Sequence, residues 1–401
     1  MSKTTSNTSS FLTESAPREK QTTTSPMPLE LHLGIEVFVL VLLGLIMVYS
    51  ASSTVPFKEL AEKAQVLKSS SHYLKRQLIC IGLGIAVIAL VRRIPYGWYR
   101  EQARWMFLLS IAALILVLIP GIGAEFNHAR RWFQLKGFSL QPAEYAKVIW
   151  VIFLSVSLTK KQEGIRKIWI GFLPHVSLCG ILSLLVLIEP DFGNTFVIGC
   201  LTVLMMAVAG VPFGHLLTLV PVAGLGFYKF VYLVPYRWER VTAFRNPWTD
   251  PLDSGYQLIQ AWIAVGSGGL WGKGLGASQQ KLFYLPESHT DFILAVIGEE
   301  LGFGGIALVC AVFFCLSWTG LHISRRAPDQ LGSLIAFGLT MLLSLQALLN
   351  MGVVLGLVPT KGLPLPFVSY GGSAFLASCV AVGLLMSIAR SGEKRVESPY
   401  V

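Results

Sequence analysis

Ten long apolar stretches, separated by polar segments, run through the 401-residue sequence. Most of them approach or exceed the roughly 20 residues that a helix needs to cross a bilayer. Only 13% of the residues are charged, whereas soluble domains carry about 25%. We therefore expect an all-α polytopic membrane protein with about ten transmembrane helices. The expected spans are residues 32–51, 77–91, 105–120, one that ends near 158, 168–188, 194–210, 213–233, 291–323, 331–353 and 373–389.

A single membrane domain is expected to take up most of the chain. We assign it residues 31–390. Residues 1–30 precede it as a disordered tail, because they are rich in Ser and Thr and lack apolar periodicity. Residues 391–401 form a second tail. Between spans seven and eight lies a long polar segment, residues 234–290, whose many aromatic side chains argue against disorder. We expect this segment to be a large folded extracytoplasmic loop.

The positive charges bear on the orientation of the chain. An even number of spans places both termini on one side, whose segments hold 16 of the 32 Lys and Arg residues, and the other 16 lie on the opposite side or at the edges of spans. The side with the termini concentrates them in short loops, which are the loops that set orientation. We therefore expect both termini to be cytoplasmic. The net charge of +10 suits attraction to anionic membrane lipids. No polar domain gathers the Lys and Arg, so no nucleic acid is expected as a partner.

Four outer polar segments hold the residues suited to chemistry. The first contains Arg131, Trp132 and Gln141, followed by Glu144 and Lys147. Glu144 and Lys147 are three residues apart at the start of a helix, so they share a face and can pair. A carboxylate within a membrane is costly and often marks function. A structural ion pair that orients the helix explains these two residues equally well.

The second segment is Glu189-Pro190-Asp191, followed by Phe192 and Gly193. Pro190 interrupts the helix, and such breaks are tolerated at membrane depth where they line a cavity. Asp191 is the candidate cavity residue. The plain alternative is a charged turn between two spans.

The third segment surrounds Asp291, where the long loop becomes a helix. Glu287 and His289 precede it, and Glu299 and Glu300 follow it about two turns later, where they could share its face. A helix N-terminus favours an ionised Asp, and Asp291 is the candidate catalytic carboxylate. The alternative is an N-cap, which Asp provides well. A cap explains Asp291 but leaves the other acids and His289 without a reason.

The fourth segment is residues 359–372, where three prolines and three glycines force an irregular backbone. Such a backbone next to a membrane suits a re-entrant loop that lines a polar cavity, and a stiff connector is the alternative. Its candidate site residues are Lys361, Ser369 and Tyr370. Arg240 and Lys281 of the long loop complete the candidate set.

The chemistry of these residues points to an anionic amphiphile. Arg holds phosphate with paired donors, and a carboxylate beside a hydroxyl suits general-base catalysis. Transfer from a lipid phosphate donor onto a hydroxyl fits this set, but so does passage of a lipid headgroup through the bundle. No Walker A, HExxH, GxSxG or zinc pattern is present. The glycines between 269 and 276 follow no strand, so we exclude a nucleotide-binding loop.

Several of these segments resemble one known family. The stretches RWFQL…QPAEYAK, EPDFG, GYQLIQAWIAVGSGGLWGKGLGASQQKLFYLPESHTDFILAVIGEELG and NMGVVLGLVPTKGLPLPFVSYGGS are similar to those of the SEDS family (shape, elongation, division, sporulation). Within them, GYQLIQ, GKGLG and QKLFYLPE look more like the division member than the elongation member. Ala143 stands where the family usually has Ser, and Lys361 stands where Thr is common. Neither departure breaks the site.

The resemblance implies a ten-span peptidoglycan glycosyltransferase that polymerises lipid II into glycan strands during cell division. It places the enzyme in the bacterial cytoplasmic (inner) membrane at the division septum, active at the outer face. It implies that Asp291 of the HTDF motif is the essential catalytic residue, and it points to Trp132 and to the Glu144–Lys147 pair. The expected partners are a class B penicillin-binding transpeptidase and other division proteins.

Two roles for Asp291 stay open. It accepts the proton of the acceptor sugar's 4-hydroxyl while Arg and Lys side chains stabilise the departing undecaprenyl pyrophosphate. In the alternative, a divalent cation, Mg or Mn, shares that task with Asp291 as its ligand. The competing function is a lipid II flippase, which needs a polar path across the membrane, whereas the polar segments gather on one side. A structural division scaffold would leave Asp291, Glu299 and Glu300 without a reason.

Overall fold

The computed structural model describes residues 27–52, 70–126, 129–135, 138–282, 284–360 and 362–397. In this part of the chain, ten helical segments are long and apolar enough to cross a membrane, which confirms the expected helical ten-span fold. The spanning helices are α1 (Leu29–Ser52), α3 (Ser70–Val91), α4 (Trp98–Leu118), α5 (Pro142–Lys160), α6 (Leu173–Ile188), α7 (Phe192–Ala209), α12 (Ile293–Arg326), α13 (Gln330–Val354) and α14 (Gly372–Glu397), with the seventh span built from shorter pieces.

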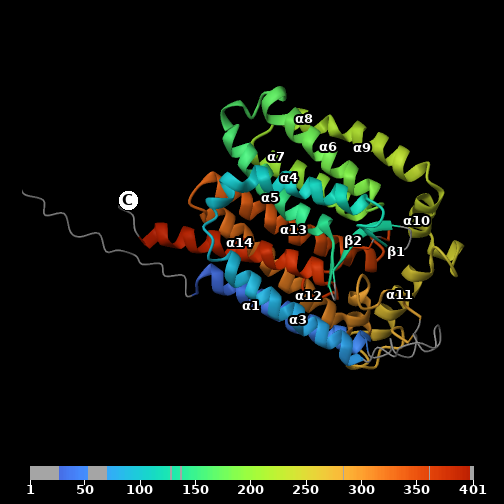
Figure 1. The fold of residues 1–401 in the computed structure, drawn as a ribbon. Helices are drawn as coiled ribbons and strands as arrows, with labels where there is room; N and C mark the ends of the chain where they lie inside the picture. The colour runs from blue at the N-terminus through green and yellow to red at the C-terminus, as the bar shows by residue number, and fades with distance from the viewer. Residues whose placement is uncertain are drawn as a thin grey trace, which may run out of the picture.

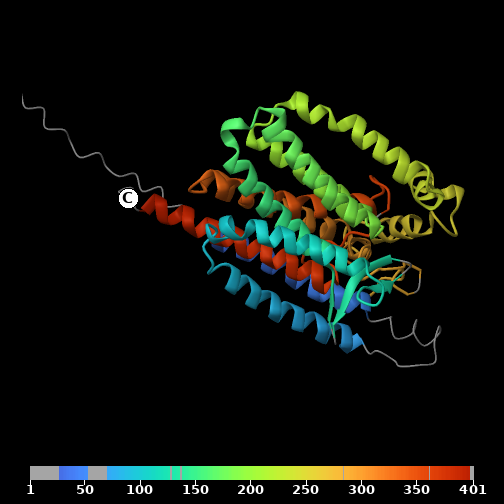
Figure 2. The ribbon, with the colours of Figure 1, turned by 45° about the horizontal axis from the view of Figure 1, so that its top comes forward.

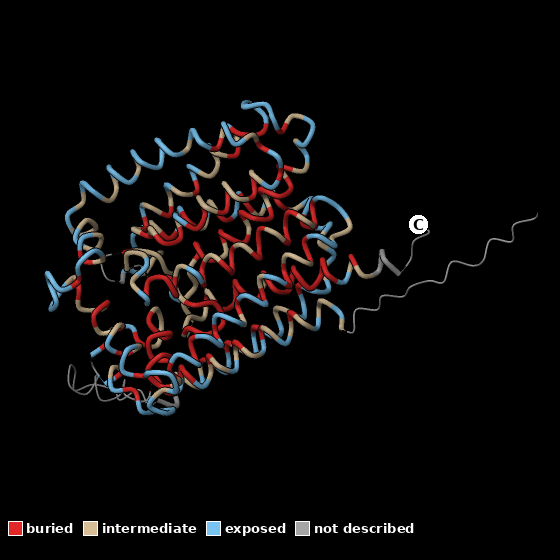
Figure 3. Tube along the Cα trace, turned by 180° about the vertical axis from the view of Figure 1, so that it is seen from behind, coloured by how far each residue is buried: buried red, intermediate tan, exposed pale blue. Residues whose placement is uncertain are grey.

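The seventh span is composite and lies at the edge of the bundle. It consists of α8 (Phe213–Leu217), α9 (Leu219–Phe227) and the π-helical segment η3 (Tyr228–Tyr232). Only 6% of its spanning window is buried, against 72% for α5 and α13 and 83% for α14. Figure 3 shows this span as a pale blue edge beside a red centre. The core of the protein is therefore α5, α13 and α14, and span seven covers one flank loosely.

The polar elements gather at one end of the bundle. The first described residues of α1 and the last of α14 lie together at the opposite end (Figure 1), where the Leu29 amide donates to Glu393 Oε1 at 3.0 Å. This agrees with an even number of spans. The compartment that each end faces stays a prediction, as do the domain boundaries. Residues 1–26 of the expected first tail lie outside the described residues, and α14 continues through Glu397, beyond the expected domain end.

The long segment between spans seven and eight contains helices. They are α10 (Pro235–Arg245), the 3-10 turn η4 (Pro247–Thr249) and α11 (Tyr256–Gly268). Pro235 begins α10, at the first helical position where proline is common. A glycine-rich turn follows α11 and leads to α12.

The connection between the third and fourth spans is a small antiparallel sheet, which the sequence did not lead us to expect. Strands β1 (Ala124–Phe126), β2 (Ala129–Leu135) and β3 (Phe138–Leu140) pair in that order. Ala124 lies opposite Trp132, and Phe133 opposite Leu140. Figure 2 shows the sheet at the same end of the bundle as α10. Strands of three to seven residues are too short for their two-residue period to stand out from a loop.

The eighth span, α12, bends at Gly302, whose φ of 68° and ψ of −163° are not helical. A bend frees backbone groups, and these need partners in a membrane. The glycine-rich run 269–274 supplies them, because an added Cβ on Gly272 would lie 2.1 Å from the Glu300 carbonyl oxygen. Only glycine allows two backbones to approach so closely. The bonds are Lys273 N to Glu299 O, Gly274 N to Glu300 O, Phe303 N to Gly269 O and Gly304 N to Leu270 O, between 2.8 and 3.2 Å.

We predict that Gly44→Ala lowers stability and that Gly82→Ala does not. An added Cβ on Gly44 would lie 2.6 Å from the Phe367 carbonyl oxygen and 2.7 Å from Val368 Cα. These are backbone atoms, so α1 would have to move away. Among the described residues, nothing lies within 4 Å of an added Cβ on Gly82. We expect Gly44→Ala to cost about 1–3 kcal/mol, seen as a lower midpoint of thermal unfolding in detergent. Equal midpoints for the two variants would contradict this packing.

Candidate active site

A cavity of about 1020 Å³ lies between span seven and the start of α7. Its walls are mostly apolar and include Phe227 of α9 and Phe196 of α7. Residues 359, 360 and 362 of the fourth polar segment also line it. Four charged side chains complete the lining: Arg131, Asp191, Arg237 and Arg240. An apolar space with several guanidinium groups fits an anionic amphiphile.

Asp291 lies beside this cavity. An added Cβ on Gly362, a lining residue, would lie 2.8 Å from Asp291 Oδ2. Helix α12 begins at Ile293 with Phe292 as its N-cap, and no side chain caps it. Asp291 is therefore not the N-cap of the helix, and the structural alternative for this residue is wrong. Its carboxylate does not cap α12 and is available for another role.

The surroundings of Asp291 make it a weak acid. Burial, followed by the nearby charges of Glu287 and Asp191, raises the pKa of its carboxyl to about 7, against a lowering by Arg240. No hydrogen bond from the described residues lowers this pKa. A carboxylate with a pKa near 7 is well matched to general-base catalysis at neutral pH.

Hydrogen bonds to the backbone hold the Asp291 loop in place. Asn350 of α13 donates through Nδ2 to the Asp291 carbonyl at 2.8 Å and to the Leu363 carbonyl at 2.7 Å. Ser369 Oγ donates to the Thr290 carbonyl at 2.5 Å. The third and fourth polar segments are therefore joined to each other and to the core. The sequence analysis missed Asn350, although an amide within an apolar span is a usable signal.

His289, Tyr370 and Glu287 support the same loop. The His289 ring packs edge-on to Tyr73 at 5.7 Å between centroids and against Tyr370 at 5.8 Å, and the Tyr370 amide donates to the His289 carbonyl at 3.0 Å. Glu287 has a positive φ of 54° and accepts from Thr290 Oγ1 at 2.8 Å. Strained backbone of this kind clusters at functional sites. These residues shape the turn that presents Asp291.

The second polar segment is both a turn and part of the cavity wall. Arg131 donates through Nε to the Glu189 carbonyl at 2.6 Å and through Nη2 to the Pro190 carbonyl at 2.8 Å. It thereby satisfies backbone groups freed by the helix break. Asp191 is the N-cap of α7 and accepts from the Asn194 amide at 3.0 Å. Burial, followed by the charge of Asp191, raises the pKa of the Glu189 carboxyl to about 9, against a lowering by Arg131.

A buried polar ladder leads from Asp191 into the bundle. Gln141 Nε2 and Asn194 Nδ2 both donate to Asp191 Oδ2, at 3.2 and 2.9 Å. Lys147 Nζ donates to Asn194 Oδ1 at 2.6 Å and to Glu144 Oε1 at 2.9 Å. Glu144 is 3% exposed and Lys147 is 1% exposed. The Glu144–Lys147 pair is thus a buried structural pair that orients α5 against α7 and supports the cavity wall through Asp191.

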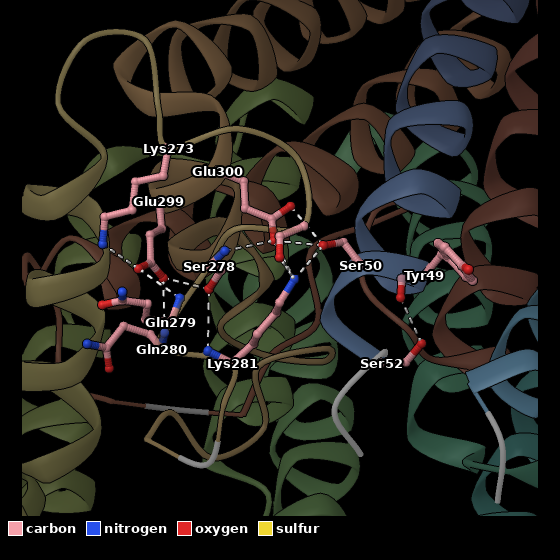
Figure 4. A network of polar contacts seen from close by, with 11 residues as sticks. Tyr49, Ser50, Ser52, Lys273, Ser278, Gln279, Gln280, Lys281, Glu299 and Glu300 are labelled. Atoms are coloured by element: carbon pink, nitrogen blue, oxygen red, sulfur yellow. Dashed lines mark hydrogen bonds and ion pairs between the residues drawn. The ribbon is translucent and has the colours of Figure 1, made fainter. Parts of the chain in front are cut away.

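Lys281 and Glu300 belong to a separate network, shown in Figure 4. Lys281 Nζ and Ser50 Oγ donate to Glu300 Oε1 at 2.8 and 2.7 Å. Lys273 Nζ donates to Glu299 Oε1 at 2.8 Å. Both carboxylates are at most 1% exposed. These pairs fasten the loop of residues 273–281 to α12 and α1. Lys281 and Glu300 do not line the described cavity. The structure does not bring Glu299 or Glu300 together with Asp291.

Three expectations remain. Trp132 lies half-buried in β2 and does not line the described cavity. Lys361 lies outside the described residues. Among those that are described, no three His, Cys, Asp or Glu residues form a group that could hold a metal ion. Mg²⁺ is also bound by one or two carboxylates together with substrate phosphates, so a metal-binding role of Asp291 stays a prediction.

Comparison with known proteins identifies the family and the fold. A protein of Geobacter metallireducens named "Probable peptidoglycan glycosyltransferase FtsW" is 43% identical over 345 residues, which cover 86% of this chain and 90% of that protein. A solved structure described as "Structural coordination of polymerization and crosslinking by a peptidoglycan synthase complex" contains a chain with 28% identity and a TM-score of 0.71. The match covers 90% of this chain and 97% of that one.

Rod shape determining protein RodA of Thermus thermophilus has the same fold, with a TM-score of 0.64 and 27% identity over 89% of this chain and 95% of its own. A family model for FtsW, RodA and SpoVE, described as "Cell cycle protein", matches residues 31–394. The resemblance found in the motifs is confirmed, and the chain belongs to the SEDS family.

Proposed function

We propose that this chain is a peptidoglycan glycosyltransferase that polymerises lipid II into glycan strands during cell division. The observation that carries the proposal is the carboxylate of Asp291, which has a pKa of about 7 and lies next to a cavity lined by apolar side chains and three arginines. The relatives named as peptidoglycan glycosyltransferases support the choice of lipid II as the substrate.

The proposed step is a displacement at the donor sugar. The 4-hydroxyl oxygen of the acceptor sugar attacks C1 of the donor sugar, and Asp291 takes the hydroxyl proton. The bond between C1 and the diphosphate oxygen breaks, and the polyprenyl diphosphate leaves with the bonding electrons. Arg240, whose charge already acts on Asp291, stabilises this leaving group. Asp291 then releases its proton to water.

The cavity accommodates both parts of such a donor. The apolar walls from α7, α9 and η3 suit the polyprenyl chain, and the guanidinium group of Arg240 suits the diphosphate. A flippase would need a hydrated polar path further into the bundle. The ladder below Asp191 is not such a path, because Glu144, Lys147 and Asn194 are at most 3% exposed and are hydrogen-bonded to one another.

The finer expectations on location and partners follow from this function. The polar end of the bundle faces the periplasmic side of the bacterial cytoplasmic membrane at the septum, and both termini are cytoplasmic. A class B penicillin-binding transpeptidase crosslinks the strands as a partner. This is supported by a similar chain that occurs in a peptidoglycan synthase complex of polymerisation and crosslinking.

We predict that Asp291→Asn abolishes polymerisation without unfolding the protein. The amide cannot accept the hydroxyl proton, and loss of a general base costs roughly 10²- to 10⁴-fold in rate. Purified parent and variant are given lipid II, the transpeptidase partner and moenomycin, which silences contaminating polymerases of another fold, and strands are counted on a gel. Asp253→Asn, on the exposed part of the long loop, is the matched control. Full activity of Asp291→Asn would refute both proposed roles of this residue.

We predict that the rate depends on pH through Asp291. The working form is the carboxylate, and its pKa is raised to about 7. The rate should therefore fall about tenfold per pH unit below that value and level off above it. Initial rates at saturating lipid II between pH 5 and 9 measure this profile. A plateau that extends down to pH 5 would show that the acid is not perturbed as described.

We predict that filling the cavity blocks the reaction. Gly226 lines the cavity, and nothing described lies within 4 Å of an added Cβ there, so we expect a Leu side chain to occupy part of the space of the lipid chain. Gly226→Leu should lower the polymerisation rate at least about tenfold, a loss typical of one displaced apolar group. Gly214→Leu, in the same span with equal free space and away from the described cavity, is the control. Equal rates for these two variants would exclude the cavity as the donor site.

A further inference from the structure

Span seven depends on few contacts to keep its place. Its pieces α9 and η3 pack mainly on each other, on α8 and on α10. Of the pieces of this span, only α8 makes substantial contact with α7. The cavity occupies the space along its inner side. The width of the cavity is therefore set by whatever joins η3 and α10 to the start of α7.

Arg237 makes that connection. Its Nη1 donates to the Phe230 carbonyl of η3 at 2.9 Å, and its guanidinium carbon lies 4.2 Å above the centre of the Phe192 ring of α7. Phe230 lines the cavity from η3 and Phe192 lines it from α7, and Arg237 lines it as well. One planar cation thus contacts both walls, which the compact ammonium of a lysine does not do.

The local sequence explains why this bond exists. The Phe230 carbonyl would find its backbone donor four or five residues later. The residue five later is Pro235, which has no N–H. The residue four later is Val234, whose amide donates to the Val231 carbonyl at 3.3 Å. The Phe230 carbonyl therefore needs another donor within an apolar setting, and Arg237, one turn into α10, supplies it.

We propose that Arg237 is a positioning residue that joins the two walls of the cavity and keeps the lipid-linked donor strand bound between successive sugar additions. This inference rests on the proposed function. With the contact closed, the polyprenyl chain lies between α7 and η3 and leaves only when the walls part. Without it, span seven moves outward more readily and the growing strand is released earlier. The chemical step at Asp291 is not changed, so the effect is on strand length.

The test compares four variants by the length of the strands they make and by their initial rate. Arg237→Gln removes the contact to both walls. Arg245→Gln makes the same change on the exposed last turn of the same helix and serves as the control. Phe192→Leu removes only the aromatic face, and Phe192→Tyr restores it. Purified lipid II at saturating concentration is the substrate, and thermal unfolding in detergent verifies that each variant is folded.

We expect Arg237→Gln and Phe192→Leu to shorten the mean strand at least about threefold, as loss of a half-buried cation–π contact permits. Phe192→Tyr and Arg245→Gln should keep the parental length. A fifth variant, which combines Arg237→Gln with Phe192→Leu, should make strands no shorter than the more severe single variant, because both changes remove one contact. Parental strand lengths from a folded Phe192→Leu variant would overturn the proposal. An absence of strands from the parent itself would overturn the proposed function and this retention role with it.

Discussion

The cost of burying a carboxylate determines how the polar end of this protein is built. A charged side chain within a membrane protein must be paired or become neutral. Glu144, Glu299 and Glu300 are paired with lysines, at 2.8 to 2.9 Å. Asp291 is an exception beside the cavity, because burial and like charges raise its pKa and no described hydrogen bond offsets them. The pairs stabilise the scaffold, and the carboxyl of Asp291, which forms no described ion pair with a lysine, is available for chemistry.

The same rule applies to the backbone. Each irregular segment at this end has a partner that satisfies its free groups: the glycine-rich run for the bend of α12, Arg131 for the break at Pro190, and Asn350 for the Asp291 loop. Because these partners come from distant parts of the chain, the breaks are rigid and not frayed. A rigid loop can hold one carboxylate beside a cavity with the accuracy that catalysis requires. Span seven is held less rigidly than these segments, because its inner side faces the cavity.

The spans could be predicted from the sequence because a bilayer requires long apolar runs, and the fifth, expected at 168–188, is observed at Ile168–Ile188. The polar segments could be recognised because charges are rare in such a chain. Their partners could not be recognised, since Ser50 and Glu300 are 250 residues apart and no local pattern indicates such a contact. Lys281 and Glu300 were therefore grouped with Asp291, although they form another network. Arg237 was overlooked because its role depends on Phe192 lying opposite.

The central claim is that Asp291 carries an acid which changes its charge near neutral pH. Infrared difference spectroscopy on the protein in lipid nanodiscs, with the Asp291→Asn spectrum subtracted at each pH, measures this directly. We expect a protonated carboxyl signal that is present at pH 5 and disappears with a midpoint near the pKa of about 7. A carboxyl that is already ionised at pH 5, as an ordinary Asp with a pKa of about 3.9 would be, would contradict it.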